Sequence, residues 1–190
     1  MFARTPRLLL RPGWMEDAPA LAHAINDPAV ARNLSRVPSP YTRADAEAFL
    51  ALPQDTRLPR LLAFTRTNGA PRLVGGCGVH LDEEGRPELG YWIARPYWGL
   101  GFATEAGRAV LSMARAAGVA DIRASHFIDN PASGNVLRKL GFRHDGKTRP
   151  LFSVARGATV ESLIFEEGDV GQLNDDPAMA VYADALLVAA

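Results

Sequence analysis

The sequence has one cysteine, no net charge and no long hydrophobic run, and each shortage excludes a class of protein. Cys77 is alone and cannot form a disulfide within the chain. Lys and Arg total 21, as do Asp and Glu, so no overall charge attracts nucleic acid or an anionic membrane. The three leucines at positions 8–10 are too few for a signal-peptide core or a membrane span. We therefore expect a cytoplasmic protein without a nucleic-acid or membrane partner.

The sequence does contain enough hydrophobic residues, 47% of 190, to bury the core of one domain. Helices are predicted at residues 17–26, 43–52, 103–117 and 131–140, with a looser segment at 29–40. Strands are predicted at residues 8–11, 61–67, 73–81, 88–94, 120–128, 143–154 and 159–166, the second and third flanking a turn at Asn68-Gly69. Antiparallel strands followed by strand–helix–strand–helix–strand indicate a mixed sheet with helices packed on it.

The tail differs in composition from the rest of the chain. Residues 168–176 are acidic and typical of a loop, whereas residues 178–188 are apolar and helical in composition but too short to cross a bilayer. We expect one domain over residues 1–167, followed by an acidic linker and a short apolar segment over 168–190. That segment would dock on the domain or on a second subunit, so a homodimer is one alternative.

Two glycines flank a single residue in PYWGLGFATEAG, between a predicted strand and a predicted helix. The first N–H groups of a helix lack internal partners, and the helix dipole makes that end positive, so it suits a phosphate. Gly99 and Gly101 would let the backbone approach closely. The stretch lacks the Gly-Lys-Ser/Thr ending of a nucleoside-triphosphate loop, and Thr104 replaces the third glycine of a dinucleotide fingerprint. A pyrophosphate site and a plain connecting turn both fit.

The stretch DNPASGNVLRKLGF has the signals of a short helix. Asn130 is an N-cap, Pro131 follows at the first helical position, and Gly141 ends the helix. These signals do not account for the additional polar residues Ser133 and Asn135 near the start of the helix.

With both stretches in view, the sequence resembles the GNAT superfamily of acetyl-CoA-dependent N-acetyltransferases, and most closely its RimJ/RimL-like branch of ribosomal-protein N-terminal acetyltransferases. The resemblance covers about residues 5–166 and rests on TPRLLLRP, PELGYWIARPYWGLGFATEA and NPASGNVLRKLGF in this order. One departure is Pro96, which stands where the family usually has Gln or Arg and which removes one N–H donor. The tail after Glu167 has no counterpart in the family.

The resemblance implies an α/β (α+β) fold with a mixed, mostly antiparallel twisted sheet of about seven strands and helices on both faces. The sheet would split in a V between the fourth and fifth predicted strands, and acetyl-CoA would bind there as cosubstrate, with no metal. The backbone of Trp92 and Ile93 would pair with pantetheine, Asn130 would contact the pantetheine side, and Asn135 the far end of the cofactor. The pyrophosphate would be held by the amides of Trp98, Gly99, Leu100, Gly101, Phe102, Ala103 and Thr104.

The implied reaction is attack of a neutral amine on the thioester, with the N–H of Ile93 stabilising the oxyanion. Glu88 is the candidate base, or else it pairs with an arginine or positions a water. Ser133 would face the sulfur and is the candidate acid, or else it only hydrogen-bonds at the helix start. No tyrosine is near Ser133 in sequence, and Tyr91 is expected to line a wall. Cys77 has no role in this chemistry and is expected to be buried.

Other polar residues carry weaker expectations. The four histidines are scattered without metal-ligand spacing, which predicts no metal site; His80 and His126 would border the cleft or be partly buried strand residues. The early segments would cover the acceptor side. Four arginines would face an acidic acceptor or simply be solvated: Arg36, Arg43, Arg149 and Arg156.

The acceptor stays open at this point. The resemblance makes a protein N-terminus the first candidate. Its amine has a pKa of ~8 and roughly a tenth of it is neutral at pH 7, so an enzyme for N-termini could manage with a weak base or a water chain. The alternatives are a GNAT enzyme acting on a small-molecule amine, or a non-catalytic acyl-CoA-binding module. The latter would keep Gly99, Gly101 and Asn130 but would need neither Glu88 nor Ser133.

Overall fold

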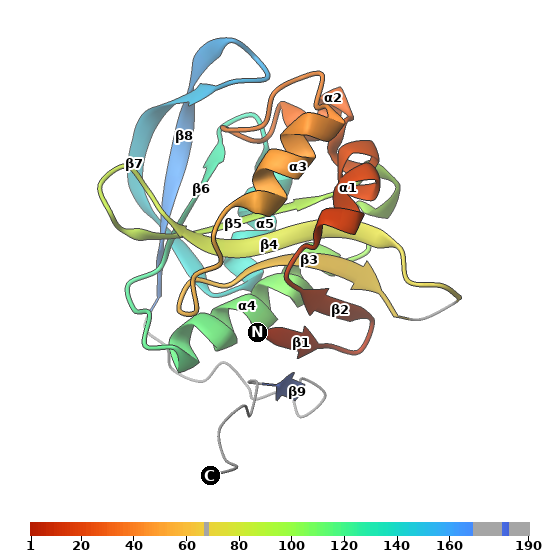
Figure 1. Cartoon of the computed structure of the whole chain (residues 1–190). Coiled ribbons are helices and arrows are strands. Elements are labelled where there is room, and N and C mark those ends of the chain that lie inside the picture. The colour runs from red at the N-terminus through yellow and green to blue at the C-terminus, as the bar shows by residue number, and fades with distance from the viewer. Residues whose placement is uncertain (67–68, 169–179, 183–190) are drawn as a thin grey trace.

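The computed structural model describes residues 1–66, 69–168 and 180–182. The strands in these residues form a nine-stranded sheet in the order β7-β8-β6-β5-β4-β3-β2-β1-β9 (Figure 1). Neighbouring strands are antiparallel except for the parallel pair β5 and β6. The strands are β1 (Phe2–Arg4), β2 (Leu8–Arg11), β3 (Arg60–Thr65), β4 (Leu73–Leu81), β5 (Pro87–Ile93), β6 (Arg123–Phe127), β7 (Phe142–Ser153), β8 (Ala158–Glu167) and β9 (Ala180–Tyr182).

Helices cover both faces of the sheet, as expected (Figure 1). Alternation along β3 divides the core: Leu61 and Ala63 pack in the cluster on the α4 face, while Leu62 and Phe64 pack in the cluster under α1 and α3. Each cluster contains buried hydrophobic residues of the sheet and of the helices over it, so the helices on each face are held by burial of hydrophobic surface. The α-helices are α1 (Ala18–Ile25), α2 (Pro28–Ala31), α3 (Arg43–Ala51), α4 (Phe102–Ala116) and α5 (Pro131–Lys139), and the 3-10 helices are η1 (Met15–Asp17) and η2 (Arg95–Tyr97).

The sheet splits between β5 and β6, which are the fourth and fifth of the predicted strands. The two strands pair only at Glu88–Arg123 and Leu89–Ala124. Beyond Leu89 the β5 backbone continues to Ile93 without β6 as a neighbour. The predicted fold class, including this V-shaped opening, is therefore confirmed.

Several element bounds differ from the predictions. Strands β1 and β9 were not expected, because three residues are too few to show an alternating pattern. The segment expected to be loose contains α2, which begins at Pro28 and is capped by Asp27, whose Oδ1 accepts from the Ala29 N–H at 2.8 Å. Strand β6 is shorter at both ends than predicted.

The helical expectation for residues 178–188 is wrong where the structure describes them. Residues 180–182 form β9, which pairs antiparallel with β1, Phe2 opposite Tyr182 and Arg4 opposite Ala180. An edge strand such as β1 offers unpaired N–H and C=O groups, and a short apolar segment satisfies them as a strand. Residues 180–182 thus dock on the chain's own sheet, while Asn68, residues 169–179 of the tail and residues 183–190 lie outside the described residues.

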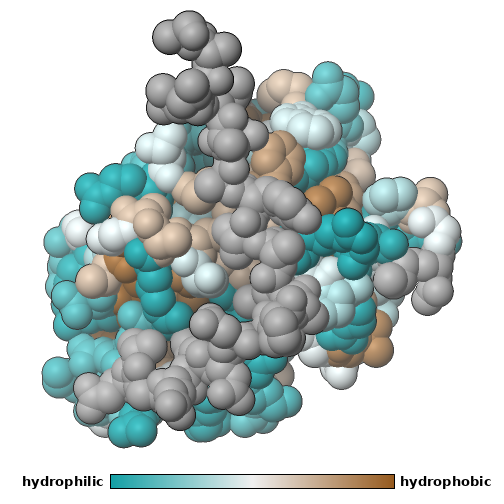
Figure 2. All heavy atoms as spheres, turned by 90° about the horizontal axis from the view of Figure 1, so that it is seen from below, coloured by the Kyte–Doolittle hydropathy of each residue, from teal (hydrophilic) through white to brown (hydrophobic). Residues whose placement is uncertain are grey.

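The face seen in Figure 2 mixes hydrophilic and hydrophobic residues over the coloured surface. Within the described part of the chain, every helix is too short or too polar to cross a membrane.

Candidate active site

The V opens into a cavity of about 840 Å³, which is within the range of small-molecule sites. Strands β5 and β6, the N-termini of α4 and α5, the segment after α2, and β7 all contribute to its wall. Leu100 is the one predicted site residue that does not line it. The structure brings the others together: Glu88, Trp92, Ile93, Trp98, Gly99, Gly101, Phe102, Ala103, Thr104, Asn130, Ser133 and Asn135.

The turn before α4 has the conformation that its glycines allow. Gly99 and Gly101 have φ values of 77° and 81°, in the left-handed region that other residues resist. Gly101 is the N-cap and no side chain caps the helix, so the N–H groups of Phe102, Ala103 and Thr104 have no partner among the described residues. A Cβ at Gly99 would meet nothing within 4 Å. This helix end can therefore accept an anionic group from the cavity.

The amide of Trp98 differs from the others in the predicted set. Its N–H donates to the Arg95 carbonyl at 3.2 Å, so the available amides begin at Gly99. Its indole Nε1 donates to the Ile93 carbonyl at 2.6 Å. Trp98 therefore ties the turn to the end of β5.

An anchor from the other end of the chain also holds this turn. The Arg7 guanidinium donates to the Leu100 carbonyl at 2.8 Å and to Glu105 in the first turn of α4 at 2.7 Å. Thr5 adds a hydroxyl hydrogen bond to Glu105 at 2.6 Å. Sequence reasoning missed Arg7 and Glu105, which are 98 residues apart, because no local pattern indicates so distant a contact.

Alternation along β5 decides which backbone groups face the opening. The Ala94 N–H donates to the Val74 carbonyl on β4 at 2.9 Å, so the groups of Ile93 and Tyr91 point to the opposite side, toward β6. Trp92 pairs instead with Gly76 on β4. The expectation for Ile93 is compatible with this geometry, whereas Tyr91 has the backbone direction that was expected of Trp92.

The start of α5 carries a hydroxyl pair. Asn130 caps the helix by accepting from the Ser133 N–H at 3.3 Å. The Ser133 Oγ lies 2.6 Å from the Tyr91 hydroxyl, which also donates to the Ser133 carbonyl at 3.0 Å. Burial raises the pKa of Tyr91, so its hydroxyl stays protonated at neutral pH. The fold thus places a tyrosine beside Ser133, although none is near it in sequence.

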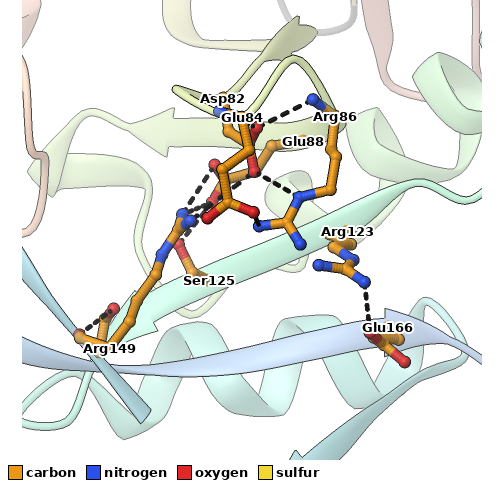
Figure 3. Close-up of polar contacts among 9 residues, drawn as sticks. Asp82, Glu84, Arg86, Glu88, Arg123, Ser125, Arg149 and Glu166 are labelled. Atoms are coloured by element: carbon orange, nitrogen blue, oxygen red, sulfur yellow. Dashed lines mark hydrogen bonds and ion pairs between the residues drawn. The ribbon is translucent and has the colours of Figure 1, made fainter. Parts of the chain in front are cut away.

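Glu88 lies on the other face of β5, within a group of charged residues (Figure 3). The Ser125 hydroxyl donates to Glu88 Oε1 at 2.5 Å, and Arg149 Nη2 donates to Oε2 at 3.2 Å. Arg149 also lies 3.7 Å from Asp82, which pairs with Arg86 at 3.2 Å. Glu88 therefore does pair with an arginine, one of the two alternatives to its role as a base.

The other three arginines that were expected near the acceptor differ in whether they form ion pairs or line the cavity. Arg156 binds both oxygens of Asp129 at 2.8 and 2.9 Å, and Arg43 pairs with Glu47 at 2.7 Å. Arg36 lines the cavity. Only Arg36 and Arg149 of the four are thus in contact with the open space of the cleft.

Two histidines border the cavity, His80 and His126. Burial lowers the pKa of each, so both imidazoles are neutral at pH 7. His126 Nδ1 lies 2.8 Å from the Phe127 carbonyl, and its Nε2 is buried without a partner in the described structure. Among the described residues no group of three or more His, Cys, Asp or Glu could hold a metal.

Cys77 is buried, with 4% of its surface exposed. Burial raises its pKa to about 12, so the thiol is protonated and inert, which confirms the expectation of a small core residue.

Several proteins with a related sequence or fold are described as acetyltransferases. The protein YoaA of Bacillus subtilis (strain 168), an uncharacterized N-acetyltransferase, is 32% identical over 153 residues, which cover 76% of this chain and 84% of YoaA. A GNAT-family acetyltransferase structure from Bacillus anthracis superimposes with a TM-score of 0.73 at 22% identity, covering 87% of this chain and 97% of that one. The microcin C7 self-immunity acetyltransferase MccE, solved with acetyl-CoA and AMP, has a TM-score of 0.67 at 16% identity, covering 85% and 92% of the two chains. The acetyltransferase (GNAT) domain model matches residues 7–143, and the chain therefore belongs to the GNAT acetyltransferase family.

Proposed function

We propose that the protein binds acetyl-CoA in the V-shaped opening and transfers the acetyl group to a primary amine, with a protein N-terminus as the first candidate acceptor. The observation that carries the proposal is the turn from Gly99 to Thr104, where unpaired amides face a cavity at the end of a splayed strand. MccE, which has a related fold, binds acetyl-CoA. The proposed location is the cytoplasm, where a buried, unpaired thiol such as Cys77 suits the reducing conditions.

The residues around the opening fit this cosubstrate. The amides of Gly99 to Thr104 would hold the pyrophosphate, and the backbone of Tyr91 would pair with the pantetheine arm. Ile93 would offer only its N–H, because its carbonyl accepts from the Trp98 indole. Asn130 and Asn135, at the start of α5, also line the cavity and would contact the pantetheine side and the far end of the cofactor. Together these groups supply hydrogen bonds along the whole cleft, from the α4 N-terminus to the point where β5 and β6 meet.

Acetyl-CoA supplies the acetyl group as a thioester, and residues of this chain would direct its transfer. The Ile93 N–H would stabilise negative charge on the carbonyl oxygen. Ser133 would give a proton to the departing thiolate, and the Tyr91 hydroxyl would hold the Ser133 hydroxyl in place. Proximity and orientation supply much of the remaining acceleration.

Glu88, the candidate base from the sequence, lines the cleft, but its carboxylate already accepts hydrogen bonds. Arg149 and Ser125 both donate to its carboxylate. These two contacts engage both oxygens of the carboxylate, which would otherwise be open to the acceptor amine. Glu88 remains a candidate that a pH profile can test.

The acceptor proposal rests on the resemblance to the RimJ/RimL-like branch. An α-amine has a pKa of ~8, so an enzyme for N-termini needs only weak assistance to deprotonate it, unlike an enzyme for lysine with its pKa of ~10.4.

Release of coenzyme A thiol from acetyl-CoA, measured with a panel of peptides and small amines, tests the proposal. We expect turnover with at least one peptide and none with the same peptide carrying a blocked N-terminus. Turnover with small amines alone would assign a small-molecule acceptor. Tight binding of acetyl-CoA without turnover on any acceptor would instead indicate a non-catalytic module.

A further inference from the structure

His80 lies at the point where the sheet opens. It is on β4 directly opposite Glu88 of β5, and it lines the cavity. A Cβ built on Gly90 would be 3.4 Å from the imidazole Cε1 and 3.6 Å from Nδ1. The ring therefore lies over Gly90, the first residue of β5 after the last pair with β6 at Leu89. Since Gly90 has no side chain, nothing from that residue separates the ring from the opening.

The imidazole of His80, in contrast to the carboxylate of Glu88, makes no hydrogen bond to a described residue. Neither ring nitrogen of His80 has a hydrogen bond to a described residue, and neither is a buried unsatisfied atom, so both reach the open space. Glu88 receives hydrogen bonds from Ser125 and Arg149. Of the two groups, His80 is the one whose proton-accepting atoms carry no hydrogen bond from a described residue.

The charges around His80 come from four elements. Burial is the largest effect and lowers its pKa. Glu88 on β5 and Asp82 after β4 raise the pKa, while Arg36 after α2 and Arg149 on β7 lower it. These opposing charges leave the effect of burial dominant, so the ring is neutral at pH 7 and ready to accept a proton.

We propose that His80 is the general base that deprotonates the acceptor amine, an inference that rests on the proposed acetyltransferase function. The imidazole takes one proton from the acceptor ammonium, and the neutral amine forms a C–N bond with the carbonyl carbon. As the C–S bond breaks, the remaining surplus proton on nitrogen passes to the thiolate by way of the Ser133 hydroxyl. His80 then releases its proton to water in the open cleft. The net products are the acetylated amine, coenzyme A thiol and one proton.

The test is the pH dependence of kcat for His80→Gln, with acetyl-CoA and the best peptide acceptor of the panel at saturation. Without a base, only the amine that is already neutral reacts, which is about 3% at pH 6.5 for a pKa of ~8. We therefore expect kcat to fall about 30-fold at pH 6.5 and less than about twofold at pH 9. Acetyl-CoA affinity, measured by calorimetry, should not change. His23→Gln, which changes an exposed histidine on α1, should match the wild type at every pH.

Each outcome separates the alternatives. A loss of equal size at all pH values would mean that His80 has a structural role, and would overturn the proposal. A pH-dependent loss in Glu88→Gln but not in His80→Gln would assign the base to Glu88. If circular dichroism shows that the His80→Gln variant is unfolded, the same pH profile is measured with His80→Asn instead. No turnover by the wild type on any acceptor would overturn the proposed function itself, whereas wild-type turnover with an unchanged His80→Gln profile would overturn only the role of His80.

Discussion

The two walls of the cleft present different kinds of groups to the cavity. The wall formed by the turn before α4 presents backbone N–H groups, and its conformation depends on Gly99 and Gly101. The wall formed by β4, β5 and β7 presents side chains, among them His80, Glu88 and Arg149. A backbone site suits a constant cosubstrate, because it binds the same phosphate groups whatever the side chains are. A side-chain site suits a variable acceptor, because side chains can change without altering the fold.

Gly101→Val should have the largest effect and should affect the backbone wall alone. The β-branched side chain opposes the φ of 81° and fills the approach to the α4 N-terminus. We expect acetyl-CoA to bind at least about 100-fold more weakly by calorimetry, a loss of about 2.7 kcal/mol.

The matched control is Gly118→Val, at the other end of α4 with a φ of 79° and no atom within 4 Å of an added Cβ. Both variants should lose about 1–3 kcal/mol of stability from backbone strain. Equal loss of acetyl-CoA binding in the two variants would show that strain, not the anion site, explains the effect.

Tyr91→Phe tests the hydroxyl pair at the boundary between the two walls. Removal of the hydroxyl leaves Ser133 without its partner at 2.6 Å. We expect kcat to fall about tenfold, which is less than the 10²–10⁴-fold of a group that transfers the proton itself, with acetyl-CoA affinity unchanged. Ser133→Ala should cost at least as much, and the double variant should be no worse than Ser133→Ala, because the two residues act as one unit. Additive losses would mean that Tyr91 and Ser133 act separately.

Arg149→Ala tests the charge balance of the side-chain wall. Arg149 lowers the pKa of His80, while Glu88 and Asp82 raise it. Without the guanidinium the pKa of His80 rises, so the acid limb of the kcat profile should move to higher pH and activity at pH 6 should fall several-fold. Arg43→Ala, which breaks an exposed pair with Glu47, should leave the profile in place. A shift to lower pH would contradict the proposed arrangement of charges.

Deletion of residues 169–190 should have the smallest effect and should change neither wall. It removes β9, which contacts the sheet only through β1 at the edge far from the cleft. We expect acetyl-CoA affinity and kcat within about twofold of the wild type, and a loss of at most about 1 kcal/mol in the free energy of unfolding, as for other changes at a surface. A large loss of turnover would show that the tail takes part in the reaction.

Local sequence predicted the elements and the glycine turn of the backbone wall, whereas its assignment as a cofactor site came from the resemblance to the family. Each strand and helix around it has its own signals, such as the Asn130-Pro131 start of α5, and the turn needs glycine at 99 and 101 because of its backbone angles. The Tyr91–Ser133 and Arg7–Glu105 contacts could not be predicted in this way, because they join residues 42 and 98 positions apart. The short strands β1 and β9 were not predicted either, because three residues are too few to show the alternation of apolar and polar residues that marks a strand.

The sequence by itself indicated most of the strands and helices and the glycine turn before α4, because hydrophobic periodicity and backbone angles are properties of neighbouring residues. Only the tertiary structure decided three contacts. Arg149 donates a hydrogen bond to the Glu88 carboxylate, the His80 ring lies over Gly90 without a hydrogen bond to a described residue, and the Tyr91 hydroxyl lies beside the Ser133 hydroxyl. Those choices depend on which strands become neighbours and on where β5 leaves β6, and a hydrogen bond between distant residues forms only after the sheet has brought them together.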